Sequence, residues 1–561
     1  MLTNYFGKTT LACTLIFLFV SLTNPISAQT ASPPHLEKQG SRSVLLVKNK
    51  PFLILGAELH NSSTSNLRYM DTIWPRLVQM NLNTVLAPLS WELIEPNEGK
   101  FDFSLVDGLI EKARKNKLKL VFLWFASWKN LVSTYAPAWV KNNPERFPLH
   151  IKKGGERYQM LSAFSAEGML ADSKAFAALM KHIKQVDAVE QTVIMMQVEN
   201  EVGTSSSERD CSKIANDLYE RQVPEKLIDY LTANKPNLIP SFKEVWGNNG
   251  FKTKGSWKEI FGEGPSNEIF MSWYLASYIS EVIRAGKAEY NIPMYVNAAI
   301  GRQNGKIGTY PSGSPLPFVM DVWRAAAPQL DMLSPDIYFG VFTDFCRTYT
   351  QSGNPLFIPE TRGGEFGAAN LIMAIGNYNA IGFSPFGIDG RFEDTATGIP
   401  SVYKALQQLS PLILRSESLR QMTSVSLDTS KKNSTLTLGN YQIDCNLQGG
   451  PPAFNNSSLA FGNSPPGYAI IIQTGKDEFF VAGKNISLQF SLKDNKDKIT
   501  GIEWAEEGDF NNEVWVPGRR MNGDEVMVSY SLSNLFKEGK SGNGLRFTNK
   551  VSIQKVKLYQ Y

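Results

Sequence analysis

Residues Thr192–Gly203 read TVIMMQVENEVG, an apolar and β-rich run that ends in two carboxylates and an amide. The apolar part is typical of a strand buried on both faces of a parallel sheet. Similar runs recur along the chain, with amphipathic stretches between them. The eight predicted strands are 52–57, 84–89, 119–125, 192–198, 294–298, 332–338, 356–359 and 380–386. Eight alternating strand and helix units predict an α/β protein with a closed (β/α)8 TIM barrel.

The barrel is expected to occupy residues 40–415, with a polar insertion rich in Gly, Asn and Lys at about 204–264. This insertion follows the fourth strand, so it would form either a wall of the active site or a peripheral decoration. Beyond residue 416 the chain changes to short alternating strands separated by turns rich in Gly, Asn, Asp and Pro. Residues 416–561 are therefore predicted to form a smaller all-β domain of the β-sandwich kind. Its two tryptophans in 504–520 would either contact carbohydrate or pack in a core.

The first 28 residues are typical of a signal peptide. Lys8 precedes an apolar run from Leu11 to Val20, and Ile26-Ser27-Ala28 forms a plausible cleavage site. We therefore expect a secreted or periplasmic protein. The apolar run is about half the ~20 residues that a membrane-spanning helix needs. No stable membrane insertion is expected once the signal has been removed.

Charge and composition exclude several classes of function. The chain has 57 basic and 53 acidic residues and no basic stripe, so nucleic acid is not expected as a partner. Without the signal, the cysteines are Cys211, Cys346 and Cys445, an odd number without the short spacing of metal sites. One disulfide stays possible. With only four histidines, neither a metal nor a cofactor is predicted, and carboxylates remain as the catalytic candidates.

Two predicted strands end in carboxylates. The fourth ends at Asn200-Glu201, and the seventh, 356–359, is followed by Glu360. Active sites of such barrels lie at the C-terminal ends of the strands, so these side chains would face each other. Glycoside hydrolysis uses such a pair of carboxyl groups. We predict Glu201 as the general acid/base and Glu360 as the nucleophile, with burial and a neighbouring carboxylate raising the pKa of Glu201.

Other polar residues near the strand ends have open roles. Tyr338, at the end of the sixth strand, or Arg362 would keep Glu360 ionised. Alternation along the strand places Glu199 away from the site, where it would pair with a core arginine. His60 would either bind substrate or be a satisfied core histidine.

Four segments resemble glycoside hydrolase family 35, the β-galactosidases. VENEVG at 198–203 is similar to the acid/base signature, and WELIEP at 91–96, followed by EGKFDF at 98–103, to the second-strand motif. GAELH at 56–60 resembles the first strand, and IPE at 358–360 occupies the place of the nucleophile. The resemblance covers about residues 40–415. The tail resembles the small β-domain of a bacterial branch that includes enzymes trimming xyloglucan.

The resemblance implies roles for individual residues. Asn200 would bond the 2-hydroxyl of the sugar, and Tyr338 would orient Glu360. Trp91 would belong to the substrate site, and Trp128 would either stack under the sugar or be a packing residue. The implied activity is release of terminal β-galactose from plant-type oligosaccharides or polysaccharides, such as xyloglucan fragments.

The third strand departs from the family pattern. Many members have Cys-Ala-Glu-Trp there, and the glutamate grips the galactose hydroxyls, whereas this chain has Phe125-Ala126-Ser127-Trp128. Asn130 or Lys129 would have to substitute for it. The change leaves two alternatives open. One is the same chemistry on another sugar, by a β-glucosidase or an arabinopyranosidase. The other is a carbohydrate-binding protein without activity, with the C-terminal domain as its binding module.

Overall fold

The computed structural model describes residue 1 and residues 32–40, 42–205, 207–300, 305–390, 398–415, 421–448, 465–495, 497–521, 523–528 and 542–561. The predicted signal peptide therefore lies outside the described residues, apart from Met1. Within the described ranges, no helix combines the length and the apolar character needed to cross a membrane.

Eight parallel strands close a barrel in the order β10-β11-β12-β13-β4-β5-β6-β9. Their bounds are β4 Ile54–Glu58, β5 Thr84–Ser90, β6 Lys119–Lys129, β9 Val193–Asn200, β10 Met294–Ala299, β11 Met332–Ile337, β12 Phe357–Thr361 and β13 Gly382–Pro385. Each overlaps one of the eight predicted strands. The predicted fold class, a TIM barrel followed by an all-β region, is confirmed.

Helices follow the strands as in other barrels of this type. Helix α4 shows why they form: Val106, Leu109, Ile110 and Ala113 recur at helical spacing and are all buried. The helices around the barrel are α1 Leu67–Asp71, α2 Trp74–Gln79, α3 Trp91–Ile94, α4 Ser104–Lys115, α5 Ala138–Lys141, α6 Ala166–Asp187, α11 Pro265–Glu289, α12 Met320–Ala326, α13 Phe342–Tyr349, α14 Gly364–Tyr378 and α16 Ile399–Ile413.

The N-terminal end of the barrel interior is apolar. Ile54, Leu86, Val121, Met332 and Phe357 belong to one buried cluster with other side chains of the barrel. The cluster also contains residues of a small sheet formed by β1 His35–Gln39, β2 Arg42–Val47 and β3 Lys50–Phe52. Polar side chains inside the barrel therefore lie toward the opposite end, where the strands finish.

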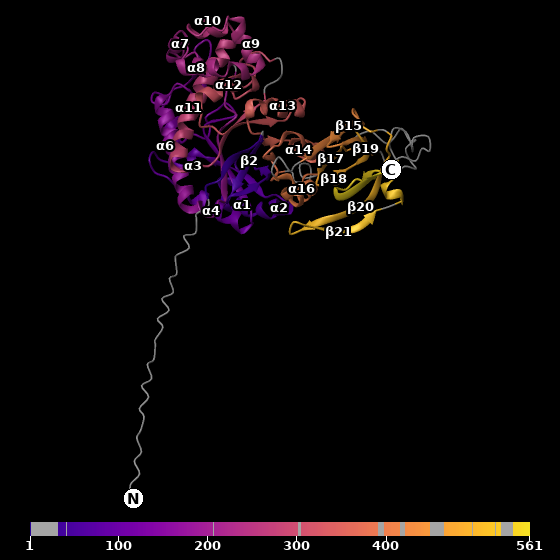
Figure 1. The fold of residues 1–561 in the computed structure, drawn as a ribbon. Helices are drawn as coiled ribbons and strands as arrows, with labels where there is room; N and C mark the ends of the chain where they lie inside the picture. Colours follow the sequence, from indigo (N-terminus) through magenta and orange to yellow (C-terminus); the bar gives the residue numbers. More distant parts are fainter. Residues whose placement is uncertain are drawn as a thin grey trace. The chain divides into compact units, whose positions relative to one another are not determined.

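The insertion after the fourth barrel strand is helical. It consists of α7 Lys213–Tyr219, α8 Glu225–Ala233, α9 Pro240–Asn248 and α10 Trp257–Phe261, which lie together near α11 and α12 (Figure 1). Phe242, Trp246 and Trp257 are buried in it. Buried aliphatic residues, among them Leu227 and Ile260, complete this core despite the polar composition of the insertion. A hairpin of β7 Leu149–Ile151 and β8 Arg157–Leu161 lies between the third and fourth barrel strands in the chain.

The C-terminal region has two antiparallel sheets. The six-stranded sheet, in the order β14-β17-β18-β23-β20-β21, is formed by β14 Gln421–Leu427, β17 Gly467–Gln473, β18 Glu478–Lys484, β20 Thr500–Asn511, β21 Val514–Met521 and β23 Ser552–Gln560. The four-stranded sheet is formed by β15 Asn433–Leu438, β16 Tyr441–Leu447, β19 Ile486–Leu492 and β22 Leu545–Phe547. Both sheets contribute to one buried apolar cluster, which includes Ile443, Ile471 and Phe490.

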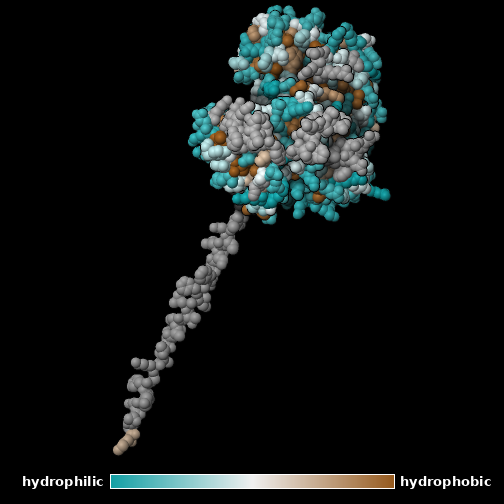
Figure 2. Space-filling view, turned by 90° about the vertical axis from the view of Figure 1, so that its right-hand side faces the viewer, coloured by the Kyte–Doolittle hydropathy of each residue, from teal (hydrophilic) through white to brown (hydrophobic). Residues whose placement is uncertain are grey.

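The six-stranded sheet also packs against the barrel. Ile470, Phe480 and Ile553 belong to the same core cluster as the barrel helices, and residues 32–561 form one compact unit. Trp515 packs edge-on against Phe480 and the neighbouring Phe510, so it is a packing residue. On one face of the molecule, hydrophilic residues predominate and hydrophobic ones lie between them in small groups (Figure 2). Within the described chain, Cys211, Cys346 and Cys445 are all free thiols, so the possible disulfide is not formed.

Candidate active site

The predicted catalytic pair lies at the C-terminal end of the barrel, together with a third carboxyl group. Glu201, Asp336 and Glu360 follow or end β9, β11 and β12, and one carboxylate oxygen of each lies within 4.8 Å of the others. Three oxygens at this spacing would also suit a hard cation such as Mg²⁺ or Ca²⁺. Sequence reasoning quoted Asp336 only as part of a strand and missed its place in this cluster.

The backbone of Glu201 is fixed from the neighbouring strand. Its amide N–H donates to the Oδ1 atom of Asn297 at 3.0 Å, and the Asn297 amide donates in turn to Asp336 at 2.8 Å. Glu199 and Glu201 both have positive φ angles, 60° and 45°, which non-glycine residues adopt at a cost. Such strain is typical of functional sites. It also breaks the simple strand alternation at the point where the site begins.

The environment of Glu201 suits a group that exchanges protons near neutral pH. Burial raises the pKa of Glu201 to about 7, with a further contribution from the negative charge of Glu360. The positive charge of Lys129 and a hydrogen bond from Asp336 oppose this rise. A general acid/base needs a pKa close to the working pH, as Glu201 has.

Glu360 is held by the predicted tyrosine. The Tyr338 hydroxyl donates to Oε1 of Glu360 at 2.5 Å, and Glu360 is only 7% exposed. Burial, with the charge of Glu360, raises the pKa of Tyr338, so the phenol keeps its proton and stays a donor. Arg362, the other candidate, lies over the ring of Phe339, with 5.2 Å from its Cζ atom to the ring centroid.

A buried lysine lies close to Glu201. The Lys129 ammonium donates to Oδ1 of Asn200 and to Oδ1 of Asn130, both at 2.8 Å. Lys129 is 5% exposed, whereas Asn130 is exposed. The Nδ2 atom of Asn200 is buried and has no hydrogen-bond partner among the described residues. An amide donor beside Glu201 is therefore free for a ligand, as the resemblance implies for Asn200.

The structure corrects the prediction that Trp91 and Trp128 bind substrate. Both side chains are completely buried. The Trp91 indole donates to Glu95 at 2.8 Å, and the Trp128 indole donates to the backbone oxygen of Leu161 at 2.9 Å. Because their N–H groups are satisfied within the protein and both rings belong to the main core cluster, they are packing residues. The pattern could not distinguish them from sugar-stacking residues, because both uses require a large aromatic ring.

The prediction for Glu199 is also wrong, because no arginine pairs with this residue in the described chain. It accepts from the backbone N–H groups of Ser127 and Trp128 at 3.1 and 2.6 Å. Burial raises its pKa well above the usual range, helped by the charge of Asp172, to which it is hydrogen-bonded. The Ser127 hydroxyl donates to Asp172 at 2.6 Å and contacts the Tyr278 hydroxyl at 2.7 Å. This network joins β6 to β9 and to helices α6 and α11.

His60 is at the surface instead of in the core. Its side chain is 49% exposed, and its Nδ1 atom lies 2.8 Å from Oδ1 of Asp389. It follows β4 directly. Of the two alternatives for this residue, the core histidine is wrong, and the imidazole lies at the same end of the barrel as the carboxyl cluster.

Unpaired polar atoms gather inside this end of the barrel. Several buried side chains on the barrel strands have at least one nitrogen or oxygen without a hydrogen-bond partner in the described chain. They are Glu58, Gln197, Asn200, Tyr295, Ser334, Asp336, Glu360 and Ser384. Burying a polar atom without a hydrogen-bond partner costs free energy. A group of such atoms therefore indicates a site for a ligand with several hydroxyl groups. The sequence analysis did not single out Glu58, although this residue also lies at the end of an apolar strand.

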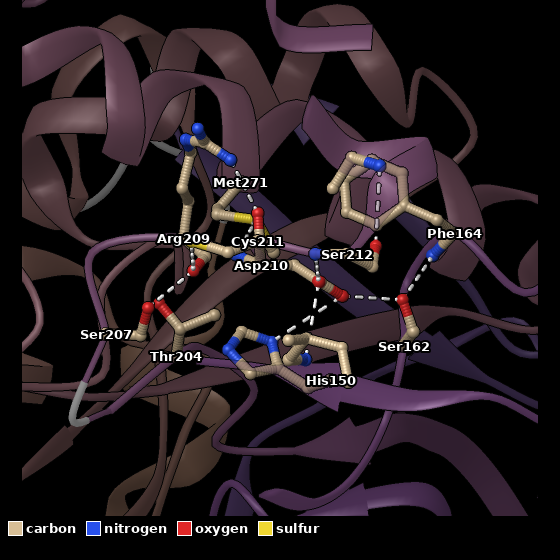
Figure 3. A network of polar contacts seen from close by, with 12 residues as sticks. His150, Ser162, Phe164, Thr204, Ser207, Arg209, Asp210, Cys211, Ser212 and Met271 are labelled. Carbon is tan, nitrogen blue, oxygen red and sulfur yellow. Dashed lines mark hydrogen bonds and ion pairs between the residues drawn. The ribbon is translucent and has the colours of Figure 1, made fainter. Parts of the chain in front are cut away.

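A second polar network is formed around Asp210, in the insertion after β9 (Figure 3). Asp210 accepts from the Ser162 hydroxyl at 2.6 Å and from the Ser212 backbone at 2.7 Å, and His150 lies 3.8 Å away. Burial lowers the pKa of His150, which favours its neutral form. Because Ser162 donates to Asp210 and not to His150, the histidine does not activate this serine. The network is structural and joins β7 to the start of the insertion.

Comparison with known families points to the same chemistry. Residues 64–266 match the model of glycoside hydrolase family 42, described as β-galactosidase. Residues 399–532 match a model described as a domain of unknown function, DUF5597. A comparison with curated proteins found no match.

Several solved structures resemble the chain distantly. The β-galactosidase of the psychrophilic Marinomonas ef1 has 13% identity and a TM-score of 0.43 over 65% of this chain and 61% of its own. That of Bacillus circulans sp. alkalophilus has 16% identity and a TM-score of 0.45 over 64% and 57%. The catalytic domain of a β-amylase from Paenibacillus polymyxa has 13% identity and a TM-score of 0.43 over 62% and 96%. Similarities this distant add nothing to the argument from the site.

The family match bears on two expectations. The match agrees with the prediction of a glycoside hydrolase over residues 64–266. It also confirms the coarser part of the resemblance, a barrel of the β-galactosidase type, but the match is to family 42 and not to family 35.

Proposed function

We propose that this protein is a secreted, retaining exo-β-glycosidase that releases terminal β-galactose from plant-type oligosaccharides or polysaccharides such as xyloglucan fragments. The observation that carries the proposal is the spacing of Glu201 and Glu360, whose nearest-facing carboxylate oxygens lie within 4.8 Å. Retaining enzymes have carboxyl groups about 5–5.5 Å apart, whereas inverting enzymes need about 6.5–9.5 Å to admit water.

The two carboxyl groups would act in two steps. Glu360 attacks the anomeric carbon while Glu201 gives its proton to the glycosidic oxygen, which leaves with the aglycone. A covalent glycosyl ester on Glu360 results. Glu201, now ionised, takes a proton from water, and the water oxygen displaces Glu360 from the anomeric carbon. The sugar leaves with its original β configuration, and both residues return to their starting states.

We propose galactose as the sugar because the matched family model is described as β-galactosidase. The second candidate is the same reaction on another sugar, by a β-glucosidase or an arabinopyranosidase, and Ser127 at the third strand is the observation that favours it. A panel of aryl glycosides that differ only at the 4-hydroxyl and the 5-hydroxymethyl group distinguishes these. A carbohydrate-binding protein without activity would not need an acid/base with a pKa of about 7 beside a second carboxylate.

Glu360→Ala tests the proposal. The variant should lose release of nitrophenol from an aryl β-galactoside, and azide should restore turnover with formation of the α-galactosyl azide. The matched control is Glu263→Ala, because the Glu263 side chain is 88% exposed, and it should keep full activity. Full activity of Glu360→Ala would refute the nucleophile, and a β-configured azide product would refute the retaining mechanism.

A further inference from the structure

We propose that the carboxyl group of Glu58 binds ring hydroxyls of the sugar in the catalytic site, in place of the third-strand glutamate that this chain lacks. The inference rests on the proposed function and names the residue that would set its sugar preference. Glu58 ends β4, the first strand of the barrel. No role follows for it from the double-displacement chemistry itself.

Glu58 is a buried acid without a structural partner. It has no exposed surface, and neither of its carboxyl oxygens has a hydrogen-bond partner among the described residues. Burying a carboxyl group in this way is unfavourable unless a ligand completes its hydrogen bonds. A residue that only supported the fold would be paired, as the buried Glu95 is with Trp91 and with the Gly99 backbone.

Glu58 lies inside the barrel with the catalytic group. It follows Ile54 at an interval of four along the strand, and Ile54 belongs to the cluster inside the barrel, so both side chains point inward. Burial raises the pKa of Glu58 well above the usual range. The negative charge of Glu360 contributes further to this rise, and that of Glu201 contributes more weakly. A carboxyl group that keeps its proton both donates and accepts, which suits a pair of neighbouring hydroxyls.

The strand order indicates which hydroxyls Glu58 would meet. The anomeric carbon lies between Glu201 and Glu360, and Asn200 would serve the 2-hydroxyl. In the barrel, β4 is separated from β12 by β13, and from β9 by β5 and β6. Glu58 would therefore approach the sugar from a different side than Glu201 does. On that side lie the ring carbons that are distant from the glycosidic bond. These carry the 3- and 4-hydroxyls.

The residues considered earlier as substitutes are already engaged. The Ser127 hydroxyl is bound to Asp172 and Tyr278 and is completely buried among them. Lys129 holds Asn200 and Asn130. Glu58 is the remaining buried carboxyl group at this end of the described barrel that has both oxygens unpaired.

Glu58→Ala, assayed on aryl β-galactosides, tests the proposal. On the parent substrate kcat/KM should fall on the order of 10- to 100-fold, because the variant leaves sugar hydroxyls in the buried site without their hydrogen-bond partner. On the 3-deoxy or the 4-deoxy analogue the loss should largely disappear, whereas on the 2-deoxy analogue it should persist. Equal losses on all three analogues would overturn the proposal. If the wild-type protein cleaves no aryl β-glycoside, the proposed function itself fails and this inference fails with it.

A stability measurement separates recognition from a role in folding. Glu58→Leu should raise the midpoint of thermal unfolding while activity is lost, because an unpaired buried acid is replaced by an apolar side chain. Glu95→Leu is the matched control and should lower the midpoint, because it leaves the Trp91 and Gly99 donors unpaired. If Glu58→Leu lowered the midpoint as Glu95→Leu does, Glu58 would be a structural residue and the proposal would be wrong.

Discussion

At the scale of single residues, the raised pKa of Glu201 follows from its position. Burial acts first and the charge of Glu360 second, and together they move the pKa of Glu201 from 4.5 to about 7. In the first proposed step Glu201 must carry a proton, because it protonates the leaving group. We therefore expect kcat/KM for an unactivated disaccharide to fall as the pH rises through about 7. A pH–rate profile measures this directly.

The control for this prediction is Glu201→Ala with an activated aryl glycoside, whose leaving group departs without a proton. That variant should keep measurable turnover and should lose the alkaline fall. A wild-type profile that stays level through pH 7, or an alkaline fall that survives in Glu201→Ala, would assign the titration to another group.

The sequence predicted where some side chains of the site lie, and their roles stay predictions. Glu201, Glu360 and Tyr338 each follow a buried strand directly, and parallel strands all end on one side of the barrel. It failed where side-chain direction mattered. The positive φ angles at Glu199 and Glu201 cannot be read from a pattern of alternation. Nor does the sequence show that Glu58 lacks a partner, which depends on side chains from distant strands.

At the scale of elements, hydrogen bonds to buried carboxyl groups, and not an ion pair, connect the long strand β6 to β9. Glu199 receives the Ser127 and Trp128 backbone N–H groups, and Asp172 on α6 receives the Ser127 hydroxyl. This connection fixes the end of β6, where Lys129 reaches Asn200. The serine at the third strand is thus part of the scaffold, not a reduced version of a sugar-binding glutamate.

Ser127→Glu restores the residue that the family 35 pattern has at this position, and the structure predicts that it fails. The new carboxyl group would be completely buried beside Asp172 and Glu199, where like charges and lost hydration oppose it. We expect destabilisation of about 3 kcal/mol or more, measured by urea unfolding. Ser401→Glu, the same substitution at an exposed position of helix α16, should change stability little. A folded Ser127→Glu enzyme with improved galactoside cleavage would contradict this account.

At the scale of the whole molecule, the sequence separates two parts that the structure joins. The change of pattern near residue 416 marks the end of the barrel repeat. The strand that links the two regions is nevertheless visible in the sequence: Tyr468–Ile472 is apolar at every position, as expected for a strand covered on both faces. Ile471 points into the core between the two sheets, and Ile470 into the core shared with the barrel. If apolar and polar residues had alternated along this strand, the sequence would have indicated only one covered face.

Because of this shared core, we expect the barrel and the sheets to unfold together. Ile470→Ala removes a completely buried side chain from the contact and should cost about 2–5 kcal/mol. The temperature at which glycosidase activity is lost should then fall together with the midpoint of the far-UV circular dichroism transition, although Ile470 lies far from Glu201 in the chain. Val514→Ala on the same sheet, where the side chain is 65% exposed, should shift neither. If Ile470→Ala lowered the spectroscopic midpoint while activity survived to the wild-type temperature, the barrel would be stable on its own and the shared core would not couple the two regions.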